Sequence, residues 1–196
     1  MMDNSKSIQA EDVRPYVVRT YDRWIILVVV LVAGWFLFRP IFGYVVYYRG
    51  LSFERMLSLD LAERYYAKST RIYSHLYEPW LALSVLQGMD GRVHAADYQA
   101  ALSTLKQGLL YNPHSGPLSF QMCRDYYEIG HDYKPAFAAC ARSVTDDPSN
   151  KFAWDYGAWA AHRSGDEKDA VDYWRHALAI DPNYVTAARA ILRFTP

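Results

Sequence analysis

The sequence predicts an all-α protein: a long apolar N-terminal helix, then a solenoid of about three helical hairpins and a C-terminal capping helix. Residues 24–38 contain no charge. Prolines then recur at Pro113, Pro148 and Pro182, a spacing of 35 and 34 residues. A fixed period of this length is the signature of stacked structural repeats. The apolar run and the proline ladder therefore define two different parts of the chain.

Composition narrows the possible classes of function. Hydrophobic residues make up 52% of the 196 residues, which provides a buried core and excludes wholesale disorder. The 21 basic residues balance 21 acidic residues, so no overall field favours a nucleic-acid partner. Two cysteines cannot build a disulfide-dense scaffold or a paired-cysteine zinc site. We therefore expect a fold held by packing, with no nucleic-acid partner.

The apolar run is predicted to cross a membrane once. Fifteen helical residues reach only about 22 Å, which is shorter than a hydrocarbon core of roughly 30 Å. Counting on to Tyr48 gives 25 residues, or about 37 Å, which spans the core with tilt. Arg39 then lies near one boundary, and Tyr44 and Tyr47 join Tyr48 in an interfacial belt. We expect four parts: an N-terminal tail (residues 1–23), a transmembrane helix (24–48), a helical connector (49–76) and a repeat domain (77–196).

A cleavable signal peptide is the main alternative for the apolar run, because residues 31–34 imitate a cleavage site. It fits less well, since 23 residues with four acids precede the run and apolar sequence continues beyond the site. A buried core helix would need a partner layer on all sides, which the amphipathic remainder does not provide. Basic residues on the two sides nearly balance, so the positive-inside rule does not fix the orientation. The simpler topology keeps the short tail in the cytoplasm and places the repeats on the periplasmic side of a bacterial inner membrane.

In the connector and the last repeat, individual residues indicate which side of a helix is apolar and where helices begin and end. In the connector, Leu57, Leu61 and Tyr65 are spaced to lie on one stripe of a helix. In the last repeat, Gly165 is placed to end the first helix and Asp166 to cap the second. Residues 183–193 then start a further amphipathic helix, which we expect to cap the stack.

The last unit resembles the tetratricopeptide repeat, a 34-residue helix-turn-helix. Counting from Lys151, the signature places hold Trp154, Gly157, Ala158, Gly165, Ala170, Trp174, Ala177 and Pro182. Small residues at Ala158 and Ala170 allow two helices to approach closely, while the tryptophans fill the flanking space. The preceding unit follows the same register, with Arg124 where the family prefers a small residue. The unit before it fits only if about five residues are inserted around residues 88–94, and we place this Gly-containing insertion outside the helices because each helical glycine costs about 1 kcal/mol.

The resemblance implies that the first helix of each pair lines a concave surface that binds proteins. The predicted exposed places on it are Phe152, Asp155, Trp159, His162 and Arg163 in the last repeat, and Leu118, Gln121, Asp125 and Glu128 in the middle one, with Leu81 and Val85 extending the row. Trp159 is the strongest candidate anchor; for any other single place, ordinary solvent exposure is the alternative. Members of the family that grip a C-terminal carboxylate use Lys and Asn at these places, which this sequence lacks.

Cys123 and Cys140 occupy facing places of one repeat in this register, so we expect their side chains to lie close together. In an oxidising compartment they could form a disulfide. In a reducing compartment they would be two small buried hydrophobic residues. The sequence leaves both states open.

Catalysis is not expected. The six histidines do not pair at a metal-ligand spacing, and no glycine-rich phosphate loop occurs. We expect no metal, no cofactor and no small-molecule substrate. The predicted function is a membrane-anchored scaffold or assembly factor for protein-protein interactions, and the alternative is a fixed accessory subunit of a larger membrane protein complex.

Overall fold

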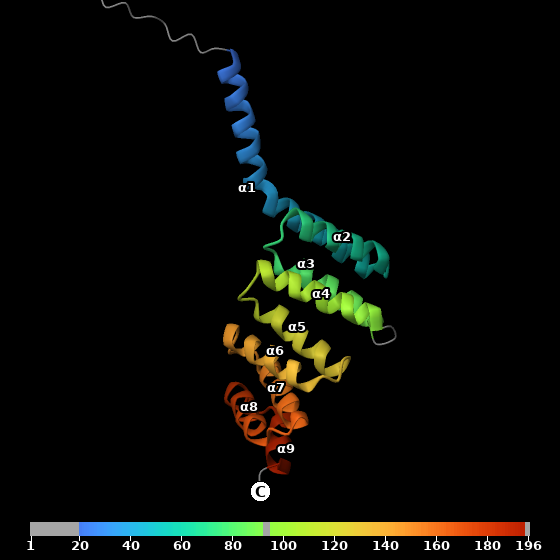
Figure 1. Ribbon diagram of the computed structural model, residues 1–196, viewed down its shortest axis with the longest axis vertical. Helices are drawn as coiled ribbons and strands as arrows, with labels where there is room; N and C mark the ends of the chain where they lie inside the picture. Colours follow the sequence, from blue (N-terminus) through green and yellow to red (C-terminus); the bar gives the residue numbers. More distant parts are fainter. Residues whose placement is uncertain (1–19, 92–94, 195–196) are drawn as a thin grey trace, which may run out of the picture. The chain divides into compact units, whose positions relative to one another are not determined.

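The computed structural model describes residues 20–91 and 95–194, and this part of the chain is all-α (Figure 1). The chain divides into two compact units, Met1–Phe38 and Arg39–Pro196. The described helices are α1 (Thr20–Arg55), α2 (Leu59–Ile72), α3 (Tyr77–Gly91), α4 (Ala95–Tyr111), α5 (Gly116–Glu128), α6 (Tyr133–Asp146), α7 (Lys151–Ser164), α8 (Glu167–Ile180) and α9 (Val185–Phe194).

The described part of the first unit is the apolar beginning of α1. Its large apolar side chains are exposed, Trp24 by 68% and Leu37 by 74%. Residues Arg23–Arg55 include an 18-residue window of mean hydropathy 2.5, and none of that window is buried. This helix is long and apolar enough to cross a membrane, although a signal sequence near the N-terminus has the same properties.

From Arg39 onward, α1 belongs to the second unit and packs on α2. The Arg39 guanidinium donates a hydrogen bond to the backbone carbonyl of Ile72. At Gly50 the two helices approach so closely that a Cβ atom would lie 2.5 Å from the Tyr66 ring. The Tyr66 hydroxyl in turn donates to the Glu54 carboxylate. These contacts join the last turns of α1 to α2 as one helix pair.

This pair repeats a contact that is also found further along the chain. Ser69 Oγ donates to the carbonyl of Gly43 at 2.8 Å, and Ser143 Oγ donates to the carbonyl of Gly116 at 2.9 Å. The sequence predicts that residues 39–48 belong to the membrane span and the residues after them to a connector. In the described residues they form a hairpin instead, which precedes α3/α4, α5/α6 and α7/α8 and is one hairpin more than predicted.

The predicted stripe on α2 is wrong. Leu57 is 85% exposed and has a positive φ of 58°, and Leu61 is also exposed. The buried side chains of α2 belong instead to Ala62, Tyr66, Ser69 and Thr70. The helix begins only at Leu59, so Leu57 lies in the turn before it and does not share its stripe.

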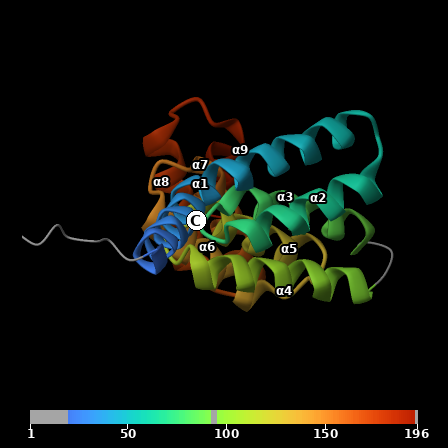
Figure 2. The ribbon, with the colours of Figure 1, turned by 90° about the horizontal axis from the view of Figure 1, so that it is seen from above.

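The insertion expected before α4 lengthens the helices. α3 continues through Gly88 to Gly91, so our placement of these glycines outside the helix is wrong. In Figures 1 and 2, α3 and α4 lie side by side. Trp80 packs on Gly108, where a Cβ atom would lie 2.9 Å from the Trp80 Cβ. Gly108 therefore allows close contact between α3 and α4. Part of the insertion, residues 92–94, lies outside the described residues.

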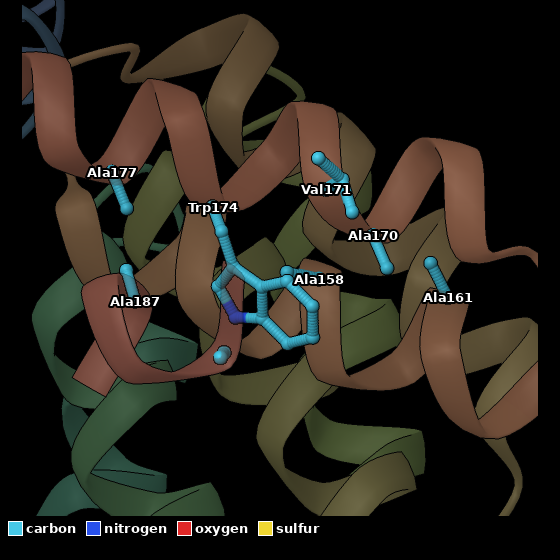
Figure 3. Packing of buried hydrophobic residues seen from close by; sticks show 8 residues of the cluster. Ala158, Ala161, Ala170, Val171, Trp174, Ala177 and Ala187 are labelled. Atoms are coloured by element: carbon cyan, nitrogen blue, oxygen red, sulfur yellow. The ribbon is translucent and has the colours of Figure 1, made fainter. Parts of the chain in front are cut away.

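The last hairpin has the predicted core. Ala158 and Ala170 are fully buried, and Trp174 lies fully buried beside them (Figure 3). Gly165 ends α7 with a φ of 89°, a left-handed conformation that glycine adopts without strain. The Asp166 side chain accepts a hydrogen bond from the backbone N–H of Asp169 and caps α8. These predictions are confirmed.

The capping helix is confirmed as α9, which follows α8 at the C-terminal end of the stack (Figure 1). Ala187 and Ala190 turn into the same cluster as Trp174. Half-buried side chains of α9, among them Phe194, cover the rest of that cluster. α9 therefore covers this side of the core of the last hairpin.

Candidate functional site

Helices α3, α5, α7 and α9 contribute to a row of hollows, and we call the surface that they carry the first-helix surface. The hollow between α5 and α7 has a volume of about 340 Å³ and is lined by Tyr127, Asp155, Tyr156, Trp159 and Arg163. A second hollow, between α3 and α5, has a volume of about 280 Å³. A third, between α7 and α9, has a volume of about 250 Å³ and shares Trp159 with the first.

Most of the predicted surface residues line these hollows. Asp155, Trp159 and Arg163 line the first hollow. Gln121, Asp125 and Glu128 line the second, together with Val85. These residues belong to three different helices, α3, α5 and α7, and line neighbouring hollows.

Two predicted residues have other surroundings. Phe152 is 50% exposed and lies against the ring of Tyr184 and the ammonium group of Lys151. The His162 ring lies 4.2 Å from the Phe194 ring, and its Nδ1 atom is 2.7 Å from a carboxylate oxygen of Glu167. Neither residue lines the hollows described above.

Three residues predicted to be exposed are buried. Asp155 is 6% exposed, Asp125 is 3% exposed and Leu118 is fully buried. Leu118 belongs to the core cluster of Trp80, because α5 packs against the preceding hairpin as well as its own partner. The two carboxylates are buried because neighbouring side chains supply hydrogen bonds, which for Asp125 include one from Gln121 at 2.8 Å.

Asp155 is the buried acidic residue that lines the first hollow. Its Oδ1 atom accepts a hydrogen bond from Trp174 Nε1 at 3.1 Å, and its Oδ2 atom accepts one from the Tyr184 hydroxyl at 2.8 Å. Burial raises the pKa of Asp155, while hydrogen bonds from Tyr184, Trp174 and Trp159 act in the opposite direction. Burial and the hydrogen bond to Asp155 raise the pKa of Tyr184 to about 12. The Asp155 carboxylate therefore accepts hydrogen bonds from donors in the interior of the repeat.

Tyrosine and arginine side chains connect the hollows. The Tyr156 hydroxyl donates to the Glu128 carboxylate, whose oxygen lies 3.7 Å from Arg124 Nη2. The Arg124 guanidinium also lies 6.0 Å from the centre of the Tyr156 ring. Burial raises the pKa of Tyr127, against a hydrogen bond with Arg163 that lowers it. These contacts hold the polar groups of α5 and α7 in place.

Sequence analysis missed Tyr127, Tyr156 and the basic residues of α9. A helical-spacing signal for Tyr156 was available, since it precedes Trp159 by three residues and therefore shares its face. Arg189 and Arg193 of α9 line the third hollow. They were missed because α9 was considered only as a cap, whereas it also continues the row of first helices.

Comparisons with known proteins identify the fold. No protein-family model and no curated protein matches the sequence. Solved structures do match: a MamA fragment from Desulfovibrio magneticus RS-1 has a TM-score of 0.63 at 17% identity, covering 78% of this chain and 82% of that one. pilF of Pseudomonas aeruginosa has a TM-score of 0.66 at 14% identity, covering 80% and 68%. YrrB, described as a TPR protein with an unusual peptide-binding site, has a TM-score of 0.58 at 17% identity, covering 76% and 73%.

The hairpins form a tetratricopeptide-repeat fold. Within this tetratricopeptide-repeat (TPR) domain, Cys123 of α5 and Cys140 of α6 are joined by a disulfide, with a Cα–Cα distance of 5.2 Å. Both residues are fully buried. The predicted proximity is confirmed, and of the two states left open by the sequence the structure contains the disulfide.

Proposed function

We propose that the protein is a membrane-anchored scaffold or assembly factor that acts through protein-protein interactions and has no catalytic role. Its first-helix surface binds a segment of a partner protein. The observation that carries this proposal is the hollow between α5 and α7, which is lined by Tyr127, Tyr156, Trp159 and Arg163. Aromatic and arginine side chains in preformed hollows supply most of the binding energy in protein interfaces. The similarity to YrrB, a peptide-binding protein by its description, agrees with this role.

Affinity capture with quantitative mass spectrometry tests the binding role. The bait is the full chain, compared with a Tyr156→Ala/Arg163→Gln variant and with a matched Arg175→Gln control. Arg175 is exposed on α8, a second helix, and is paired with Asp172. We expect the partner to be lost from the double variant and retained by the control. Equal recovery with all three baits would contradict the proposal.

The apolar beginning of α1 is the proposed anchor. Because residues from Arg39 onward are packed on α2, the anchor consists of residues 20–38 and not of the longer segment 24–48. Nineteen helical residues reach about 28 Å, and their uncharged part, residues 24–38, reaches about 22 Å. A segment of this length crosses a membrane where the bilayer thins locally or flanking residues reach the headgroups. Intact mass measurement of the purified protein separates an anchor from a signal peptide. A retained N-terminus supports the anchor, and cleavage near residue 34 contradicts it.

The proposed location of the TPR domain is the periplasmic side of a bacterial inner membrane. The Cys123–Cys140 disulfide supports this side, since disulfides persist in oxidising compartments. Protease added to sealed spheroplasts should cleave the TPR domain. Cleavage that requires opening the inner membrane would place the domain in the cytoplasm.

A fixed accessory subunit of a larger membrane complex is the second candidate. The exposed aromatic side chains of α1, Phe36 by 63% and Phe38 by 56%, suit packing against other membrane helices as well as lipid. Native mass measurement after detergent extraction distinguishes the two. A scaffold is recovered alone or with substoichiometric partners, whereas a subunit is recovered in fixed stoichiometry.

A further inference from the structure

The C-terminal end of the first-helix surface forms one continuous feature. The hollow between α5 and α7 and the hollow between α7 and α9 share Trp159 as a common wall. We call this feature the terminal groove, defined by Trp159, Arg163, Arg189, Arg193 and Phe194. Arg163 lines one of its two hollows, and Arg189 and Arg193 line the other.

The terminal groove is positively charged. Its three guanidinium groups are exposed, and among the described residues none of them forms an ion pair with a carboxylate. Within the described part of the chain, the carboxylate that lines the two hollows is Asp155, which is buried and accepts hydrogen bonds from Trp174 and Tyr184. Asp155 is therefore engaged by the core. Arg163 contacts two tyrosines, lying 5.8 Å from the centre of the Tyr133 ring and hydrogen-bonding with Tyr127, and neither contact neutralises its positive charge.

The aromatic residues of the groove pack on the buried Trp174. The Trp159 ring meets the buried Trp174 ring edge-on at 5.1 Å, and Phe194 stacks on Trp174 at 5.7 Å. The Arg193 guanidinium lies 5.3 Å from the centre of the Phe194 ring. The Trp159 and Phe194 rings lie 6.2 Å apart and are perpendicular to each other. Apolar rings flanked by cations suit a ligand that combines an apolar group with negative charge.

We propose that the terminal groove takes an acidic peptide segment of the partner protein, with an aromatic or aliphatic side chain on Trp159. Carboxylates of the segment pair with Arg163 on one side of Trp159, and with Arg189 and Arg193 on the other. This inference rests on the proposed function and names the chemistry of the ligand. A single-stranded nucleic acid also combines anions with stackable rings. The chain as a whole has no basic surplus to support such binding, with 21 basic and 21 acidic residues.

A displayed library of random peptides, selected against the detergent-solubilised full chain, tests the proposal. Three proteins are compared: wild type, an Arg163→Gln/Arg189→Gln/Arg193→Gln variant, and the Arg175→Gln control. We expect the peptides selected by wild type and control to be enriched in Asp and Glu near an aromatic or aliphatic residue. Synthetic copies of these peptides should bind the triple variant about tenfold or more weakly, and wild-type binding should weaken with added salt. Circular dichroism should show that the triple variant keeps its helicity and melting temperature, because the three side chains are exposed.

The outcomes separate this inference from the proposed function. Peptides without acidic enrichment, or with unchanged affinity for the triple variant, overturn the acidic specificity and leave a peptide-binding surface. Failure to select any peptide above background overturns peptide binding itself. Tighter binding of a thymidine oligonucleotide than of the selected peptides, with loss in the triple variant, overturns the inference in favour of nucleic acid.

Discussion

The Trp174 indole nitrogen donates a hydrogen bond to Asp155 at 3.1 Å and links the two helices of the last hairpin through their interior. Tyr184, just before α9, donates to the other carboxylate oxygen at 2.8 Å. One acidic side chain thus joins α7, α8 and the start of the cap. Asp155 also lines the hollow between α5 and α7, which we propose to bind a partner.

Removing this acceptor should destabilise the TPR domain. Asp155→Ala leaves the buried Trp174 N–H without its acceptor, which costs about 1–3 kcal/mol. Asp155→Asn keeps one acceptor oxygen for Trp174 and offers an amide to Tyr184, so its stability should stay within about 1 kcal/mol of wild type. Urea unfolding of the three proteins measures the differences. Equal loss in both variants would show that the charge itself is required.

The stability of the TPR domain should change with pH because Asp155 titrates differently in the folded and unfolded states. Burial raises its folded-state pKa above the ordinary value of 3.8. As pH rises from 3.8 through the raised value, the unfolded chain loses this proton first, so the folded state binds more protons and is destabilised. Wild type should therefore lose stability relative to Asp155→Asn between pH 3.8 and neutral pH. Melting temperatures measured across this range check the sign, and a rise of the wild-type melting temperature relative to that of Asp155→Asn toward neutral pH would refute it.

The contact between Ala158 and Ala170 should not tolerate larger side chains. Both residues are fully buried in the same cluster. Ala170→Leu should overpack the helix pair and cost about 1–3 kcal/mol. Ala179→Leu on the same helix is the matched control, because residue 179 is exposed. The melting temperature of Ala170→Leu should be lower than that of Ala179→Leu. A melting temperature of Ala170→Leu equal to that of wild type would show that α7 and α8 do not pack tightly at residue 170.

The disulfide should stabilise the TPR domain. Cys123 and Cys140 are separated by 17 residues, and closing such a loop in the unfolded chain contributes about 3 kcal/mol in the chain-entropy estimate. Denatured protein should react with a thiol reagent only after reduction. Reduced protein and a Cys123→Ala/Cys140→Ala variant should both melt at lower temperature. Reaction of unreduced protein with two equivalents of reagent would show free thiols.

Trp159 should contribute to stability as well as to binding. Sequence analysis predicted a purely exposed anchor, for which Trp159→Ala would leave stability near wild type. The structure contradicts that reasoning, since Trp159 is half-buried and packs on the cluster of Trp174. We now expect Trp159→Ala to lower both the melting temperature and the affinity for the partner. Arg163→Gln on the same helix should lower affinity alone, because its side chain is exposed.

Local signals predicted the C-terminal repeats well. Gly165 and Asp166 act over a few residues, and small residues at Ala158 and Ala170 are required wherever two helices approach closely. These effects depend little on the rest of the fold. The hairpin of α1 and α2 was missed, because its first helix continues directly from an apolar run that masks the repeat pattern.

Side-chain burial on the first-helix surface was harder to predict. Asp155 was assigned to the exposed face by its place in α7, but its hydrogen-bond partners Trp174 and Tyr184 lie outside that helix. Likewise, Leu118 is covered by residues of the preceding hairpin. Contacts with other helices decide both cases: the second helix of its own repeat and the segment before α9 for Asp155, and the preceding hairpin for Leu118.

Photo-crosslinking in intact cells tests most directly whether the first-helix surface is the partner-binding surface. A photoreactive amino acid replaces Arg124 or Arg163 on this surface, or Arg142 or Arg175 on the second helices α6 and α8. We predict that positions 124 and 163 crosslink to the same partner protein, and that positions 142 and 175 do not. Crosslinks to that partner from the second helices alone, or from no position, would contradict the account.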